Sequence, residues 1–378
     1  MALDLFHTNR PDSTLHPQFV EVRDSPRMEP ARGMLREIVA KMEDPDGNLV
    51  EQFQTHGFDS RTFEIYLQAL FTEAGHTIDR RYDRPDYLIT RNGLTVAVEA
   101  VTANPPPKKN YQPYVHVYRN PPKTQEEAIR YFRNEVAIKF GSPLYSKLKK
   151  EYWKLPHIKG LPLVIAIESF HGDASLTISS SNLSDYLFGV NHHHHFDEKG
   201  NLVVGAETVA QHKGSKSIPS NFFQLPGAEN VSAVLFSNVG TISKFNRIGH
   251  EGRYRSKQVR MVRVGHCYDI DPNATMAQTF AYEVGNSDFP KETWRQGSVL
   301  IHNPRALQPL PPEWLGAGAE ENQSAAGNVI PTWGDPFMPY MSTTYLFAGS
   351  APSSAMWEKM NKEIALLQLG QALSQQWI

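Results

Sequence analysis

The chain has 378 residues with a formal net charge of −2, and 40% of the residues are hydrophobic, 11% aromatic and 21% charged. This composition is typical of a globular protein and excludes a disordered chain, a collagen-like rod and a coiled coil. The single cysteine, Cys267, excludes a disulfide scaffold and a cysteine-rich zinc site, because both need several thiols. Taken over the whole chain, the net charge argues against a nucleic-acid partner.

The length indicates one large domain or two ordinary ones. We expect a polar segment with some helix over residues 1–57, a folded core over 58–265, and an extension over 266–378 with long loops and a C-terminal helix. The N-terminus lacks the basic start and apolar run of a signal peptide, and no segment approaches about 18 consecutive apolar residues. The sequence therefore predicts a cytoplasmic protein that does not span a membrane.

A helix and a β-hairpin are predicted at the start of the core. The helix begins near Phe58, and Gly75 is placed to end it. Its apolar residues recur at the spacing of one helical face and are Phe63, Tyr66, Leu67, Leu70 and Phe71. Asn92 and Gly93 then separate two apolar runs, 87–90 and 94–101, which is the strongest short-range signal of a two-residue hairpin turn.

The rest of the chain gives weaker signals. We expect a short strand near 76–82, either one long helix or a pair of helices broken near 141–143 over residues 124–153, buried strands over 161–170 and 231–236, irregular loops over 307–345 and a helix over 353–378. His192 to His195 are predicted to lie in a surface loop, because four neighbouring histidines seldom converge on one metal ion. Glu168 is left open between an extra metal ligand and a residue that faces the helix layer.

The register of the hairpin places two acids opposite each other. If Asn92 and Gly93 form the turn, facing residues have numbers that sum to 185, so Asp86 faces Glu99. Opposed Cβ atoms lie roughly 4.5–5.5 Å apart, and two carboxylates at about 5 Å repel by roughly 3 kcal/mol. A hard divalent cation such as Mg²⁺ would offset that repulsion. Alternatively, one acid is exposed or pairs with a nearby arginine, namely Arg80, Arg81 or Arg84.

The order of these elements resembles the PD-(D/E)XK nuclease superfamily, which includes restriction endonucleases and repair nucleases. Pro85 and Asp86 begin one strand, Glu99 lies near the end of the next, and an α-β-β-β-α-β order can be laid on residues 58–170. The resemblance implies a mixed α/β, restriction-endonuclease-like core in which a central mixed sheet is flanked by helices. It implies that Asp86 and Glu99 hold Mg²⁺ or Mn²⁺, and that Glu64 is the acid that many members supply from the first helix.

One position departs from the motif of that superfamily. Two residues after the second acid, members carry a lysine that helps to orient or activate the attacking water, and this chain has Val101 there. Members can carry the group on a neighbouring element, and Lys139 on the predicted helix is the first candidate, ahead of Lys108 and Lys109. Alternatively, the role falls to Thr102, Gln112 or a second metal ion, or catalysis has been lost.

Positive charge is concentrated in two stretches of the chain. Residues 105–160 carry twelve Lys and Arg against four Glu, and residues 242–263 carry seven against one Glu. Aromatic residues are interleaved with these cations, a combination typical of a nucleic-acid surface, although either stretch could be a solvated face. The side chains expected to contact nucleic acid are Lys108, Lys109, Lys147, Lys149, Lys150, Lys244, Arg247, Arg253, Arg255 and Lys257.

The sequence therefore favours a metal-dependent nuclease that hydrolyses phosphodiester bonds, with DNA favoured over RNA. A carboxylate-bound Mg²⁺ or Mn²⁺ would activate a water. The expected catalytic residues are Asp86, Glu99, Lys139 and Glu64, of which the three acids are the expected metal ligands. The alternatives are a nucleic-acid-binding protein that has lost hydrolysis on the same fold, and a nuclease directed at RNA. A homodimer is left open.

Overall fold

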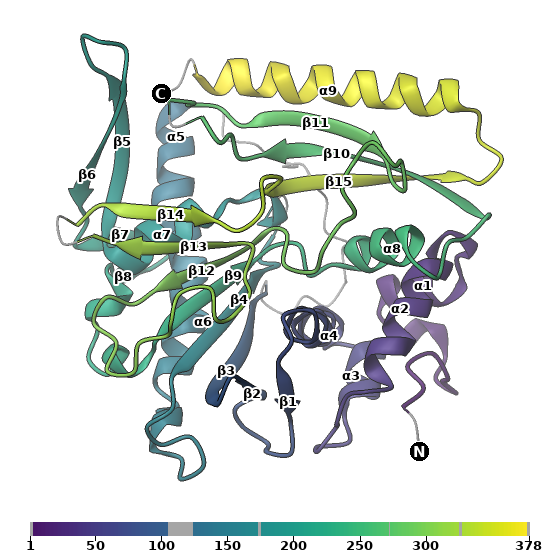
Figure 1. The fold of residues 1–378 in the computed structure, drawn as a ribbon, viewed down its shortest axis with the longest axis horizontal. Coiled ribbons are helices and arrows are strands. Elements are labelled where there is room, and N and C mark those ends of the chain that lie inside the picture. The colour runs from purple at the N-terminus through teal and green to yellow at the C-terminus, as the bar shows by residue number, and fades with distance from the viewer. Residues whose placement is uncertain (1–2, 105–123, 173–174, 272, 325–326, 376–378) are drawn as a thin grey trace.

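A mixed sheet of eight strands forms the centre of the molecule (Figure 1). The computed structural model describes residues 3–104, 124–172, 175–271, 273–324 and 327–375. The strand order across the sheet is β1-β2-β3-β4-β9-β12-β13-β14. These strands are β1 (Thr77–Asp79), β2 (Tyr87–Arg91), β3 (Leu94–Ala103), β4 (Leu163–Ser169), β9 (Ala233–Ser237), β12 (Ser298–His302), β13 (Ala319–Gln323) and β14 (Val329–Trp333).

The first half of this sheet contains the elements predicted for residues 58–170, in the predicted order. Helix α4 (Phe58–Glu73) precedes β1, β2 and β3, which pair antiparallel, and helix α6 (Val136–Leu148) leads to β4. Strand β4 pairs parallel with β3, as a crossover through a helix requires. A mixed α/β fold with a large mixed sheet flanked by helices is therefore confirmed.

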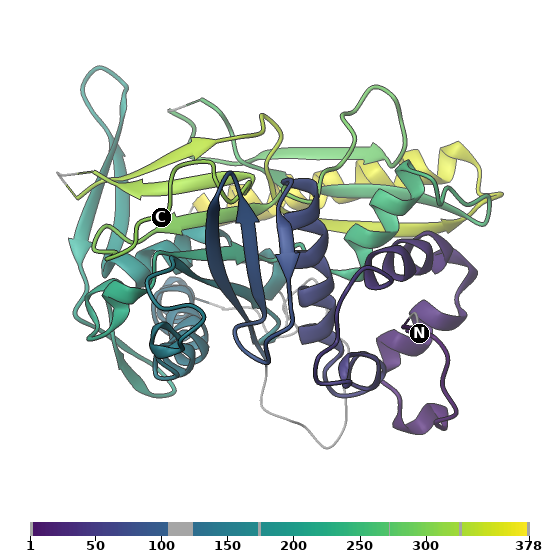
Figure 2. The same ribbon diagram turned by 60° about the horizontal axis from the view of Figure 1, so that its bottom comes forward.

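The two faces of the hairpin pack against different helices, as Figure 2 shows from the sheet's edge. Tyr87 and Val98 lie on the face that α4 covers, within a cluster of buried apolar residues. Leu88 and Ala97 lie on the other face, against Phe140 of α6. This alternation follows from the pleat of a strand, in which successive side chains point to opposite faces. The face that packs on α4 is therefore the apolar face of the hairpin.

The cluster on the α4 face also joins parts of the chain that lie far apart in the sequence. It contains Leu35 from the N-terminal helices, Phe63 from α4, and Trp294 and Leu315 from the second half of the chain. The N-terminal helices are α1 (Pro17–Asp24), α2 (Glu29–Val39) and α3 (Leu49–Gln54), and α2 packs against α8 (Ile242–Glu251). One hydrophobic core is therefore shared by residues from all three predicted segments.

A second sheet of three strands, in the order β11-β10-β15, lies beside the first and carries the C-terminal helix. Its strands are β10 (Val259–Cys267), β11 (Gln278–Glu283) and β15 (Pro339–Ala348), and the helix is α9 (Ser353–Gln375). Met356 and Met360 of α9 are buried against β10 residues such as Val262. The predicted C-terminal helix is thus confirmed, and its buried apolar residues pack on the second sheet.

Two predictions about secondary structure are wrong, and the structure decides between two alternatives at a third place. The stretch 307–345 contains β13, β14 and most of β15 rather than only loops, so residues 266–378 complete both sheets. His192 to His195 lie in strand β5 (Val190–Phe196), which pairs with β6 (Leu202–Thr208), rather than in a loop. Of the two alternatives for residues 124–153, the structure shows one long helical run, in which α5 (Gln125–Arg130) joins α6 through a π-helical turn at Tyr131–Glu135 and which continues past residue 141.

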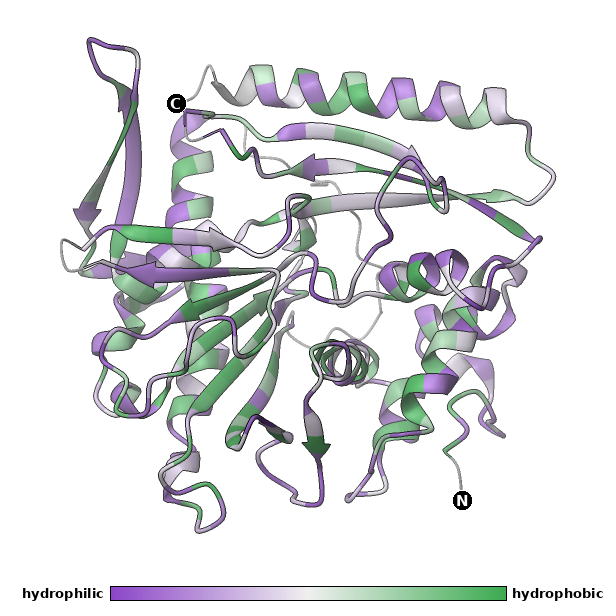
Figure 3. Cartoon of the chain, in the orientation of Figure 1, coloured by the Kyte–Doolittle hydropathy of each residue, from purple (hydrophilic) through white to green (hydrophobic). Residues whose placement is uncertain are grey.

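The remaining elements lie around these sheets and complete the described part of the chain. They include α7 (Ser180–Phe188), β7 (Gln211–Lys213) and β8 (Ser217–Pro219). Strands β4 and β9 are mostly hydrophobic (Figure 3), as expected for strands buried on both faces. None of the helices described has the length and apolar character needed to cross a membrane.

Candidate functional site

Asp86 and Glu99 converge on one face of the hairpin. Tyr87 pairs with Val98 and Arg91 with Leu94, so the predicted register is confirmed. Asp86 precedes β2 directly, and its Oδ2 accepts a hydrogen bond of 2.7 Å from the backbone N–H of Ala100. Burial raises the pKa of the Asp86 carboxyl well above its usual value, and the nearby carboxylates of Glu99 and Glu64 raise it further.

Glu99 is buried, and two donors hold the same oxygen of its carboxylate. The Nζ atom of Lys147, from the last turn of α6, and the Oη atom of Tyr152 both donate to Oε1, the latter at 2.7 Å. Burial and the neighbouring Glu99 raise the pKa of Tyr152, so this phenol keeps its proton and donates. Oε2 of Glu99 accepts no hydrogen bond from the described residues, so it is the oxygen left for another partner.

Glu64 is held by two arginines rather than by solvent. Its carboxylate accepts from Nη1 of Arg61 at 2.7 and 2.8 Å and from Nη2 of Arg80 at 2.8 Å, and its side chain is buried. The alternative in which Arg80 pairs with Asp86 or Glu99 is therefore not what the structure shows. The only atom of Asp86 to which Arg80 donates a hydrogen bond is the backbone carbonyl oxygen, at 3.2 Å.

A pocket of about 390 Å³ opens between these side chains at the C-terminal end of β3. Val101, at the position of the motif lysine, lines it together with Lys147. The amine that reaches the acids therefore comes from Lys147, two turns further along α6 than Lys139. Lys139 is not part of this lining and lies near His171, whose pKa it lowers after the larger effect of burial. The residues that line the pocket are Asp46, Ser60, Arg61, Phe63, Glu64, Asp86, Ala100, Val101, Thr102, Asn104 and Lys147.

Two other residues considered for the site lie in different surroundings, and of the two side chains only that of Thr102 has a hydrogen-bond partner among the described residues. The hydroxyl groups of Thr102 and Ser60 form a hydrogen bond of 2.7 Å. Glu168 is fully buried on the face that α4 covers, close to Gly240, and burial raises its pKa well above the usual value. Glu168 therefore faces the helix layer. Gln112, Lys108 and Lys109 lie outside the described residues.

The acids of this site differ in whether they are free to bind a divalent cation. No group of three or more His, Cys, Asp or Glu side chains in the described chain is arranged to hold a metal ion. Two acids, Asp86 and Glu99, do converge, and each keeps one carboxylate oxygen that no described residue binds. The ionised form of Asp86 is opposed by burial and by its acidic neighbours, which a cation would offset. The pair Asp86 and Glu99 therefore fits a hard cation, whereas Glu64 is already neutralised by arginines.

The predicted nucleic-acid surface is only partly exposed. Lys149 and Lys150 are exposed at the end of α6, near Lys147. Of the second stretch, Arg253, Arg255 and Lys257 are exposed, and Arg253 contacts Glu37 at 3.3 Å.

Two members of the second stretch cannot belong to such a surface. Lys244 and Arg247 are buried beside Glu292, at 3.7 and 2.6 Å, so their assignment to nucleic-acid contacts is wrong. Both lie on α8, whose inner face packs into the protein, and the cluster formed with Arg263 compensates charge internally. Burial lowers the pKa of Lys244 to about 7.

Two residues of the site were missed by the sequence reasoning. Arg61 lies three residues before Glu64, and this spacing on a helix predicts an ion pair. Tyr152 lies 53 positions from Glu99 in the chain, and no local pattern connects them. The chain matches no family model, no curated protein and no solved structure.

Proposed function

We propose that the protein is a metal-dependent nuclease that hydrolyses DNA phosphodiester bonds at the Asp86 pocket. The observation that carries the proposal is a pocket lined by Asp86 and Lys147, with the buried Glu99 bonded to Lys147 and close to Asp86, on an α-β-β-β-α-β segment. Two acids and an amine supplied by different elements are the set that the resemblance to PD-(D/E)XK nucleases implies. Lys147 takes the place that was expected for Lys139.

Each side chain has a defined part in this proposal. Asp86 and Glu99 would hold Mg²⁺ or Mn²⁺, which when bound lowers the pKa of a water and stabilises charge on the leaving oxygen. Tyr152 and Lys147 fix Oε1 of Glu99, which leaves Oε2 for the cation. The ammonium group of Lys147 lines the pocket and can balance the charge of a phosphate. Lys149 and Lys150 lie close enough along the chain to contact the backbone of a bound strand.

A second function, nucleic-acid binding without hydrolysis, is favoured by a different observation. Lys147 forms an ion pair with Glu99, and Arg61 and Arg80 neutralise Glu64, so cations of the protein itself already compensate two of the three acids. A site built in this way needs no metal ion for its stability. The two functions share the exposed lysines and differ only in whether a metal ion enters the pocket.

Cleavage assays with matched variants separate the two functions. The full chain is incubated with plasmid, single-stranded DNA and RNA in Mg²⁺, Mn²⁺ or EDTA. We expect metal-dependent cleavage of DNA that is lost in Asp86→Asn and Glu99→Gln. It should fall about 100-fold in Lys147→Met and about 10-fold in Tyr152→Phe, which removes only a supporting hydrogen bond. Glu198→Gln and Lys199→Ala, exposed residues far from the pocket in sequence, serve as charge-matched controls.

Three outcomes distinguish DNA hydrolysis from binding alone and from RNA hydrolysis. Cleavage that survives EDTA, or that is equal in Asp86→Asn and the unmodified protein, contradicts the proposed chemistry. Binding of DNA without cleavage under any of the metal conditions supports the second function. Preferential cleavage of RNA keeps the metal site and reassigns the substrate.

A further inference from the structure

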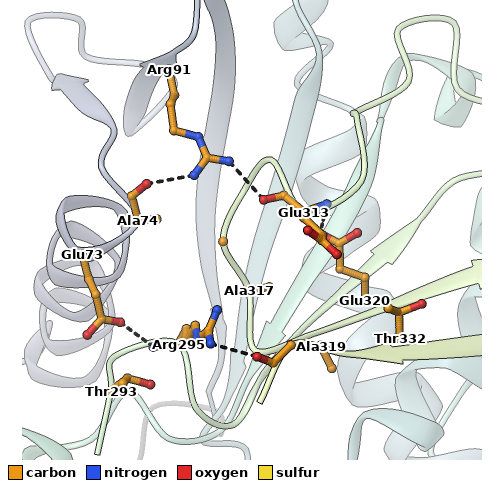
Figure 4. A pocket seen from close by; sticks show the side chains of 12 residues that line it. Glu73, Ala74, Arg91, Thr293, Arg295, Glu313, Ala317, Ala319, Glu320 and Thr332 are labelled. Atoms are coloured by element: carbon orange, nitrogen blue, oxygen red, sulfur yellow. Dashed lines mark hydrogen bonds between the residues drawn. The ribbon is translucent and has the colours of Figure 1, made fainter.

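A second pocket, of about 590 Å³, lies away from the Asp86 site and is lined by two arginines (Figure 4). Arg91 ends β2, and Arg295 lies in the turn before β12. Figure 4 shows their side chains on opposite sides of the pocket, with Glu73 and Glu320 on the other two sides. This volume falls within the range of about 300–1,000 Å³ that is usual for small-molecule sites.

Both guanidinium groups are positioned by backbone carbonyls rather than by acids. Arg91 donates to the carbonyls of Ala74 at 2.9 Å and Glu313 at 3.0 Å. Arg295 donates to the carbonyl of Gly334 at 2.8 Å. The structure records no ion pair between either guanidinium and a described carboxylate. Carbonyls orient a guanidinium without neutralising it, so two fixed positive charges line the pocket beside the carboxylates of Glu73, Glu313 and Glu320.

Three acids line the pocket, of which Glu313 is exposed and the other two, Glu73 and Glu320, are engaged by donors of the protein. Glu73 accepts from the backbone N–H groups of Trp294 at 3.0 Å and Arg295 at 3.1 Å. Glu320 accepts from the backbone N–H of Glu313 at 2.9 Å and contacts Nε2 of His302 at 3.0 Å. These bonds hold the carboxylates in place and leave them able to accept further hydrogen bonds, since each oxygen has two lone pairs.

We propose that this pocket binds a phosphate monoester that carries hydroxyl groups, with the phosphate between Arg91 and Arg295 and the hydroxyls toward Glu320. Two guanidinium groups match a doubly charged phosphate better than a singly charged carboxylate. Glu320 would repel a ligand that is anionic throughout, so the other end of the ligand must donate hydrogen bonds. Sugar hydroxyls are donors that protein carboxylates commonly bind. A mononucleotide and a sugar phosphate share this chemistry.

Calorimetric titration of the full chain in EDTA tests the proposal without involving a metal at Asp86. The probes are AMP, ribose 5-phosphate, inorganic phosphate and adenosine. We expect AMP or ribose 5-phosphate to bind at least about 10-fold more tightly than inorganic phosphate or adenosine, because only these two probes carry both groups. The tighter of the two identifies the ligand as a nucleotide or a sugar phosphate.

Variants of the pocket separate a specific site from a general attraction of anions. Arg295→Gln should weaken the preferred ligand at least about 10-fold, the loss of one charge-assisted contact. Glu320→Gln should weaken that ligand but not inorganic phosphate. Arg305→Gln, an exposed arginine outside the pocket, should change nothing. Arg91 also ties β2 to the loop before β13, so its loss could unfold the pocket, and Arg295 is the informative position.

The proposal is overturned if no phosphate probe binds at millimolar concentration, if adenosine binds as tightly as AMP, or if Arg295→Gln binds as the unmodified protein does. None of these results depends on cleavage at the Asp86 pocket. The two proposals therefore stand or fall separately.

Discussion

At the scale of single residues, the acids of the Asp86 pocket differ in how the protein compensates them. Glu64 has two arginines, Glu99 has a lysine and a phenol, and Asp86 has one backbone N–H and two acidic neighbours. The pairing of Asp86 with Glu99 was predictable because the turn fixes the register. The bond from Tyr152 to Glu99 was not predictable, since Tyr152 reaches the site from a segment whose packing no local pattern determines.

The Asp86 carboxyl should destabilise the folded protein at neutral pH. Folding raises the pKa of this carboxyl, so the folded protein holds the proton more tightly than the unfolded chain does. The folded state is therefore favoured most below the unfolded pKa of about 3.9, and this contribution to stability is lost as pH rises through the folded pKa. We expect Asp86→Asn to raise the free energy of unfolding by roughly 1 kcal/mol at neutral pH and to have no effect below about pH 4. Urea unfolding at both pH values measures this. Equal stabilisation at both would point to packing instead of charge.

The Lys244 cluster should impose an opposite dependence on pH. The groups around this ammonium are Glu292, Arg263, Arg247 and Glu73, and burial lowers its pKa to about 7. Between this folded pKa and the unfolded pKa of about 10.4, Lys244 carries its proton in the unfolded chain but not in the folded protein. The free energy of unfolding therefore rises with pH, by up to about 1.4 kcal/mol per pH unit.

A variant isolates this contribution of Lys244. Lys244→Met should flatten the slope of the unfolding free energy between about pH 7.5 and 9, measured by urea titration. The slope is the readout because the substitution also changes the absolute stability. Identical slopes in the two proteins would show that Lys244 titrates as an ordinary lysine.

At the scale of elements, the hairpin was the most predictable feature and the strands of the second half were the least. Asn92 and Gly93 both have positive φ, of 52° and 76°, which a two-residue turn of this kind requires. Strand β13, by contrast, has the sequence AEENQ, in which no apolar alternation marks a strand. It forms because β12 offers a paired edge beside it, a long-range condition that the local sequence does not contain.

The turn glycine should matter to stability because of its backbone conformation. Gly93→Ala places a Cβ at φ of 76°, and we expect the free energy of unfolding to fall by about 1 kcal/mol. Gly370→Ala is the matched control, because that glycine lies in α9 with open space around it. There alanine favours the helix and should add about 0.5–1 kcal/mol. Thermal or urea unfolding would reveal the opposite signs, and a loss at both positions would contradict the conformational explanation.

At the scale of the whole molecule, the sequence predicted a mixed α/β protein with a core that ends at residue 265. In the structure, residues on both sides of position 265 pack in the same hydrophobic cluster. Trp294 and Leu315 pack in the same cluster as Phe63, and β12 pairs directly with β9. The stretch 307–345 is rich in proline, glycine and polar residues, which is why loops were expected in this part of the chain. Burial at a few positions, rather than average composition, decides which segments share a core.

Removal of the C-terminal third should therefore prevent folding of the remainder. A chain that ends at Gly265 loses the strand beside β9, both of these core residues, and the partners of β10 in the second sheet. We expect this chain to show no cooperative thermal transition and no near-ultraviolet circular dichroism signal of fixed aromatic packing. A sharp transition with a native-like signal would establish residues 1–265 as an independent folding unit.

The order of strands in the large sheet also bears on how the protein resists aggregation. Its two outermost strands are β1, with three residues, and β14, in which Pro331 pairs with Glu321. A short edge gives an incoming chain few groups to bind, and proline offers no N–H to a neighbouring strand. Both margins of this sheet are thus poor templates for added strands. A homodimer, if one forms, would have to join through side chains on other surfaces, and fibrils that grow by extension of this sheet are disfavoured from the start.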